Sequence, residues 1–226
     1  MDRKSNAERR RERMFEMVDE GALVSDATYN LVIGLTICSG FVLNVLVGLF
    51  MGPQLSELPY WMSLILYFGC SFGGMAIAYK SNNAIVSYLG FLLLAFGFST
   101  ILFGFVAYYA PQTVIAAVYI TLGATILMMA AATALPRAFQ SLGKVLFVSL
   151  LVVLIVEVIM LITGLVEPTI VDFIVALIFC GYIGFDWSRA QAYPKTVDNA
   201  IDASVDIYVD IVNLFIRVLS ILGKRD

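Results

Sequence analysis

Two aspartates in the last quarter of the chain carry the residue pattern that most clearly points to chemistry. Asp186 comes near the end of one apolar stretch, and Asp210 lies inside the next, within Ile207–Ile216. An acid inside an apolar helix is costly in lipid, so it usually faces a bundle interior or a water-filled path. Asp186 could instead pair with Arg189 or Lys195 near the helix end. Since a polar turn joins the two stretches, we expect Asp186 and Asp210 to approach each other.

Two carboxylates in contact cannot both ionise cheaply, so such a pair shares a proton and titrates in two steps that belong to the pair. The chain contains no histidine, which is the usual titrating group near neutral pH. A carboxylate pair is therefore another way to sense pH in that range. Carboxylate oxygens are also ligands that Ca²⁺ prefers, so Asp186 and Asp210 could bind calcium transiently.

The final helix continues this acidic pattern along one face. Residues spaced by four share a helix face, and here they are Asp198, Asp202, Asp206 and Asp210, followed by Asn213 and Arg217. The pattern predicts that Asp206 and Arg217 line a path or form a latch. It is also typical of an amphipathic helix on the membrane surface. We expect Asp198 and Asp202, near the turn, to lie in water.

One further acid lies at membrane depth. Glu157 interrupts the apolar sequence from Leu154 to Met160. It could line the outer half of a path or pair with a polar neighbour such as Asn44. We expect Asp172, close to the start of its span, to lie at the membrane interface.

Seven apolar spans position these residues, each near the roughly 20 residues that cross hydrocarbon. Their predicted limits are 28–51, 60–79, 84–108, 113–134, 143–165, 169–188 and 200–222. All six prolines, the first of them Pro53, are expected between spans, where helices start or stop. Small-residue stripes for close helix packing are expected at Gly69 and Gly73, and at Gly90, Gly97 and Gly104.

The composition agrees with a polytopic membrane protein, because 61% of the residues are hydrophobic and only 14% are charged. We predict an all-α membrane protein, a seven-transmembrane-helix bundle with the C-terminal helix near its centre. Residues 1–25 form a charged arm, expected as a short surface helix, and residues 26–226 the seven-helix transmembrane domain.

Loop charges predict the orientation in a cell membrane. Basic residues occur in the N-terminal arm and in the second, fourth and sixth connections, but not in the first, third and fifth. This asymmetry places the N-terminus in the cytoplasm. Seven crossings then place the C-terminus outside. Lys224 and Arg225 at that end argue against this placement, so the seventh helix could instead be a partial or interior one, enclosed by the other helices.

The C-terminal residues also resemble a known family. The sequence Gly181–Asp186, followed by Tyr208–Phe215, resembles the Bax inhibitor-1 family, which is also called the transmembrane Bax inhibitor motif family. The chain resembles a prokaryotic member of that family. The resemblance implies that Asp186 and Asp210 form a hydrogen-bonded pH-sensing pair in a calcium leak channel, and that a basic residue such as Lys80 acts as a latch. Lys80 could equally be a loop charge that sets topology. A tyrosine commonly precedes the first acid of the family, and here it is Phe185.

We therefore expect a pH-sensitive calcium leak channel gated by the aspartate pair. The alternatives are a proton-coupled transporter and an interaction protein that modulates a membrane protease or complex. The chain has no histidine, Gly-rich phosphate loop or nucleophile elbow, so we do not expect an enzyme. The expected partners are the lipid bilayer, calcium ions and protons, with a membrane protein as a possible further partner. We expect no nucleic acid and no cofactor beyond Ca²⁺ as the transported ion.

Overall fold

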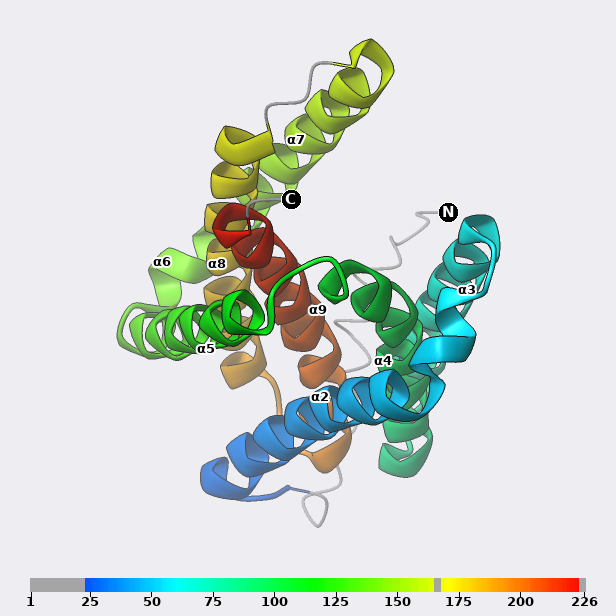
Figure 1. The fold of residues 1–226 in the computed structure, drawn as a ribbon. Coiled ribbons are helices and arrows are strands. Elements are labelled where there is room, and N and C mark those ends of the chain that lie inside the picture. Colours follow the sequence, from blue (N-terminus) through cyan, green and yellow to red (C-terminus); the bar gives the residue numbers. More distant parts are fainter. Residues whose placement is uncertain (1–22, 165–167, 224–226) are drawn as a thin grey trace, which may run out of the picture. The chain divides into compact units, whose positions relative to one another are not determined.

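The computed structural model describes residues 23–164 and 168–223, which are almost entirely helical and contain no strand (Figure 1). The predicted surface helix in the N-terminal arm lies outside these residues. The described helices are α2 (Asp26–Ser56), α3 (Tyr60–Lys80), α4 (Ala84–Val106), α5 (Pro111–Ala134), α6 (Pro136–Ser141), α7 (Gly143–Thr163), α8 (Pro168–Ala192) and α9 (Val197–Leu222). The predicted all-α membrane class is confirmed.

Six of the described helices are long and apolar enough to cross a membrane: α2, α3, α4, α5, α7 and α8. Their bounds follow the first six predicted spans closely. α9 is not among the six, because its four aspartates and Arg217 make it more polar. The count of seven crossings therefore remains a prediction.

α9 is largely buried although it is polar, whereas the six apolar helices expose many of their side chains. Those helices expose many large apolar side chains, as lipid-facing spans do, for example Leu49, Leu127 and Ile162. Most of α9 is buried, although it carries more charge. In lipid, an acidic face has to be covered by protein or by a water path.

The prolines start helices at three of the expected places. Pro111, Pro136 and Pro168 are the first residues of α5, α6 and α8, where the missing amide hydrogen needs no partner. The expectation for Pro53 is wrong, because α2 continues through it to Ser56. So close to the helix end, a proline removes at most one intrahelical hydrogen bond. The short helix α6 was not predicted.

The chain divides into two compact units. Unit 1 comprises Met1–Gly104 and Ala190–Asp206, and so contains α2, α3, α4 and the first part of α9. Unit 2 comprises Phe105–Arg189 and Ile207–Asp226, and contains α5, α6, α7, most of α8 and the rest of α9.

Within unit 1, glycines allow α3 and α4 to pack with their backbones in contact. A Cβ atom on Gly90 would lie 2.6 Å from the backbone nitrogen of Ala78 and 2.7 Å from the carbonyl oxygen of Gly74. The predicted stripe on α3 is wrong by one residue, because a Cβ on Gly69 would meet nothing within 4 Å, and one on Gly73 only a Leu93 side chain at 4.0 Å. Gly74 is the residue that makes the close approach.

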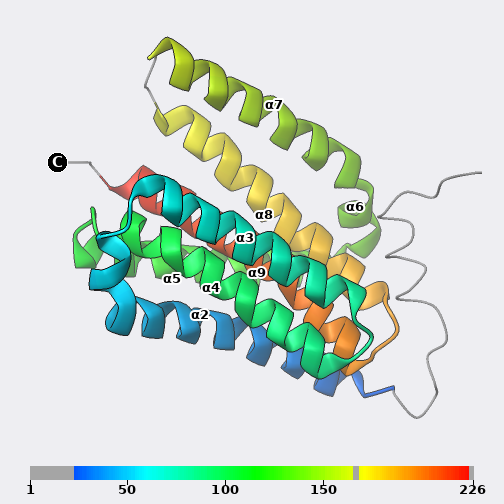
Figure 2. The same cartoon turned by 90° about the vertical axis from the view of Figure 1, so that its right-hand side faces the viewer.

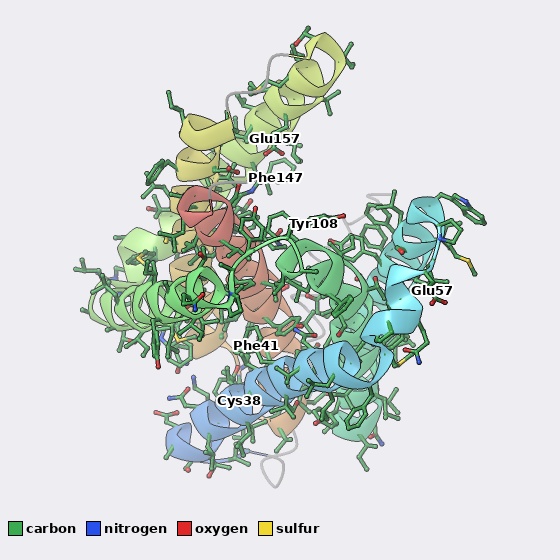
Figure 3. The ribbon with its side chains drawn as sticks, in the orientation of Figure 1. Cys38, Phe41, Glu57, Tyr108, Phe147 and Glu157 are labelled. Carbon is green, nitrogen blue, oxygen red and sulfur yellow. The ribbon has the colours of Figure 1, made fainter. Side chains whose placement is uncertain are left out.

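Within unit 2, α7 runs alongside α8 (Figure 2), and small residues again set the spacing. A Cβ on Gly181 of α8 would lie 2.6 Å from the Leu146 side chain of α7. A Cβ on Gly143 of α7 would lie 2.8 Å from the ring of Phe185. Exposed residues such as Phe147 and Tyr108 belong to the same unit (Figure 3). The packing therefore concentrates on the part of α8 that leads to Asp186.

Candidate acid-lined site

Asp186 lies inside α8, because this helix continues to Ala192, four residues beyond the predicted end at residue 188. The connection to α9 is correspondingly shorter than expected, residues 193–196. Asp186 is only 8% exposed, and its Oδ1 lies 2.9 Å from an Arg189 guanidinium nitrogen. Of the two basic partners considered for Asp186, Arg189 is the one found. The Arg189 guanidinium also lies over the Phe185 ring, 5.3 Å from its centroid.

The turn of α8 that carries Asp186 is held from two sides within unit 2. Trp187 Nε1 donates a hydrogen bond of 2.8 Å to Thr133 Oγ1 at the end of α5. Gln140 Nε2 of α6 donates to the Ser188 carbonyl oxygen at 3.2 Å. The Phe139 ring packs directly on Gly184. These contacts fix the position of the Asp186 backbone more firmly than a helix end would.

Asp210 belongs to the same compact unit as Asp186 and is 6% exposed. Its neighbours Ile207 and Ile211 on α9 are buried apolar residues. The hydroxyl of Tyr182, one turn before Asp186 on α8, interacts electrostatically with both carboxylates. Asp186 and Asp210 are thus two buried acids of one compact unit. The hydrogen-bonded pair inferred from the sequence remains a prediction.

The first half of the acidic face of α9 is enclosed within unit 1. Ser87 Oγ of α4 donates to Asp198 Oδ1 at 2.7 Å, and the Tyr79 hydroxyl of α3 donates to Asp206 Oδ1. Asp202 is 1% exposed and interacts electrostatically with Tyr29 of α2. The expectation that Asp202 lies in water is therefore wrong. Nearness to a turn does not imply solvation here, because α2, α3 and α4 all contribute side chains to this part of α9.

Lys80 is the exposed last residue of α3. Its neighbour Tyr79, rather than Lys80, is the α3 residue that reaches an acid of α9. Lys80 belongs to unit 1 and Asp186 to unit 2, so the proposed Lys80 latch stays a prediction.

Lys195 lies in the connection between α8 and α9, within unit 1. Its Nζ donates to the carbonyl oxygen and to Oε1 of Gln191, both at 2.9 Å, and lies 4.4 Å from the centroid of the Tyr29 ring. Partial burial lowers the pKa of Lys195, and the charge of Asp26 offsets part of that effect. The lysine is therefore a fixed part of the fold rather than a partner of Asp186.

A second charged cluster in unit 2 was not predicted as a cluster. Arg217 of α9 lies 2.7 Å from Glu157 Oε1 of α7 and 2.8 Å from Asp172 Oδ1 of α8. Ser220 Oγ donates to Asp172 Oδ2 at 2.6 Å. Glu157 thus pairs with Arg217, whereas Asn44, the partner suggested by the sequence, accepts a hydrogen bond from Ser99.

The sequence did not place Asp172 in this cluster, and its expected position at the membrane interface stays a prediction. It is buried in the protein, with its side chain 4% exposed. Its position within an apolar run on α8 was the available signal, together with Arg217, the one arginine of α9. No group of three or more potential metal ligands occurs among residues 23–164 and 168–223.

Comparisons with known proteins find a family match and several relatives. Residues 23–226 match the family described as "Inhibitor of apoptosis-promoting Bax1". "Bax inhibitor 1" of Schizosaccharomyces pombe is 29% identical over 178 residues, which are 76% of this chain and 63% of that protein. An uncharacterized protein of Helicobacter pylori is 27% identical over 180 residues, 78% of this chain and 68% of that protein.

A plant relative matches over a shorter region. The "BI1-like protein" of Arabidopsis thaliana is 36% identical over 92 residues, 40% of this chain and 36% of that protein. The chain thus spans less than two thirds of the length of the S. pombe and Arabidopsis relatives. The family match covers nearly the whole chain, including both aspartate motifs. The chain therefore belongs to the Bax inhibitor-1 family of multi-helix membrane proteins.

Proposed function

We propose that this protein is a pH-sensitive calcium leak channel in which Asp186 and Asp210 form the sensor and gate. The observation that supports this proposal is the burial of both carboxylates in one compact unit, on the consecutive helices α8 and α9. The calcium assignment comes from the family resemblance. The residues themselves supply a buried acidic site that is compatible with a hard cation.

The proposed gate works through the charge of the pair. In the closed state the two carboxylates share one proton. The ion pair with Arg189 favours a charged Asp186, so Asp210 is the member that would carry the proton. Loss of that proton at higher pH leaves two negative charges near each other. Their repulsion and hydration would then separate α8 from α9 and favour the open state.

The proposed path follows the acidic face of α9, which would be the seventh crossing. Asp206, one turn before Asp210, is the next candidate path residue, and Glu157 and Arg217 are candidates toward the other end. In the predicted orientation the N-terminus is cytoplasmic and the C-terminus lies outside. Nothing in this mechanism requires a bound cofactor or an enzymatic step.

The test is calcium flux from purified protein in liposomes, measured across a pH series. Asp186→Asn and Asp210→Asn should each flatten the pH dependence, because a single remaining carboxylate shares no proton. Glu57→Gln is the matched control, since Glu57 is an exposed acid outside α8 and α9 (Figure 3). Asp202 is a poor control because it is buried.

The outcomes separate the candidate functions. A pH profile that is unchanged in both aspartate variants would refute the sensor. Net substrate uptake driven by a proton gradient would favour a coupled transporter. Absence of flux at every pH, together with tight co-purification of a membrane protein, would favour an interaction protein.

A further inference from the structure

Arg217 joins three helices through two unequal ion pairs. One guanidinium nitrogen lies 2.8 Å from Asp172 of α8, which also accepts a hydrogen bond of 2.6 Å from Ser220. The other lies 2.7 Å from Glu157 of α7. The Asp172 side chain is 4% exposed, whereas that of Glu157 is 29% exposed. Among the described contacts, the Asp172 carboxylate therefore has two partners and little exposure to solvent. The Glu157 carboxylate has one partner and is more exposed.

α7 is packed firmly along its first half and loosely along its second. Leu146 and Val153 are buried, and Leu146 lies against Gly181 of α8. Beyond Val153, no described side chain of α7 is buried, and Ile162 is 79% exposed. Glu157, labelled in Figure 3, is one of the few described residues in this half that are partly buried. Its ion pair with Arg217 is therefore a specific contact between this half of α7 and α9.

The two ion pairs of Arg217 differ in which charges would remain without a partner if the pair were broken. If Glu157 moved away, Arg217 would still be neutralised by Asp172, and Glu157 could reach water or the headgroup region. If Asp172 lost Arg217, the buried carboxylate would keep only the Ser220 hydroxyl among the partners in residues 23–164 and 168–223, which is a much more costly state. Partly exposed ion pairs are weak and are screened by salt. The Glu157–Arg217 ion pair is thus the one that can break.

We infer that the Glu157–Arg217 ion pair is a releasable latch that holds the second half of α7 to α9, while Asp172 and Ser220 hold Arg217 in place. Opening of the latch moves residues 154–163 away from α9 and uncovers Arg217. The inference does not depend on calcium flux, and its test measures a distance within unit 2.

The distance can be measured by pulsed electron spin resonance between nitroxide labels in proteoliposomes. Val158→Cys on α7 and Leu222→Cys on α9 are suitable sites, because both positions are exposed. The native cysteines to be replaced by serine are Cys38, Cys70 and Cys180. Glu157→Gln should lengthen the mean distance and broaden its distribution. Lys144→Gln, which removes an exposed charge from the firmly packed half of α7, should leave the distribution unchanged.

A Glu157→Gln protein with the parental distribution would overturn the latch, as would an equal change caused by Lys144→Gln. If Glu157→Gln does not yield folded protein, a salt series on the labelled parent protein decides the question. Screening should then shift the population toward the longer distance. A distribution that stays constant from low to high salt would contradict the inference.

Discussion

Replacing Arg217 by glutamine should destabilise the protein far more than removing the glutamate that Arg217 contacts. Arg217 lies 2.8 Å from Asp172, whose side chain is 4% exposed. Arg217→Gln leaves that buried carboxylate with Ser220 as its remaining hydrogen-bond donor among the described contacts. Breaking a buried ion pair by removing one partner typically costs about 3–5 kcal/mol, and we expect a loss in that range.

Glu157→Gln removes the other ion pair of the same arginine. Its two side chains are 26% and 29% exposed, and such a pair typically contributes about 0–1 kcal/mol. The double variant Asp172→Asn/Arg217→Gln removes both charges of the buried pair and leaves no isolated charge. It should therefore recover most of the stability that Arg217→Gln alone loses.

The assay is reversible unfolding in mixed detergent micelles, followed by the fluorescence of Trp187, which lies in the same unit as the cluster. The second tryptophan, Trp61, can be replaced by phenylalanine because it is exposed. The reasoning fails if Arg217→Gln costs no more than Glu157→Gln. It also fails if the losses from Asp172→Asn and Arg217→Gln simply add in the double variant, since coupled residues should not behave additively.

Three further predictions follow from other parts of the chain. Gly90→Ala should cost about 1–3 kcal/mol by overpacking against the α3 backbone, whereas Gly104→Ala on the same helix, where a Cβ meets nothing within 4 Å, should be neutral or stabilising in the same unfolding assay. A cysteine near Gln54 should react with an impermeant outside reagent and one near Asn82 should not, and the reverse labelling would overturn the orientation. Because burial lowers the pKa of Lys195 from its ordinary 10.5, the unfolded state binds more protons just below that pH, so stability should rise there with pH. Lys195→Met should remove part of this increase in stability with pH. Identical curves of stability against pH for the parent protein and the variant would refute the prediction.

The amino-acid sequence by itself determined the long helices. Long apolar blocks can satisfy their backbone polar groups in lipid only within the same segment, so hydropathy located the six apolar spans to within a few residues at most ends. Prolines marked several starts, because Pro111 and Pro168 sit where an amide hydrogen is not needed. The spacing of four among the aspartates of α9 likewise predicted one acidic face, because helical periodicity is a local property.

Only the tertiary structure decided what each face touches. The periodicity of α9 could not tell that α2, α3 and α4 would enclose Asp202, nor that Gly74 rather than Gly73 would meet α4. Arg217 finds Asp172 at a distance of 45 positions in the chain, and no local pattern ranks that partner above other acids. Such contacts depend on which helices pack together and on their rotation about their own axes. Both are set by the summed packing of many residues that are distant in the sequence.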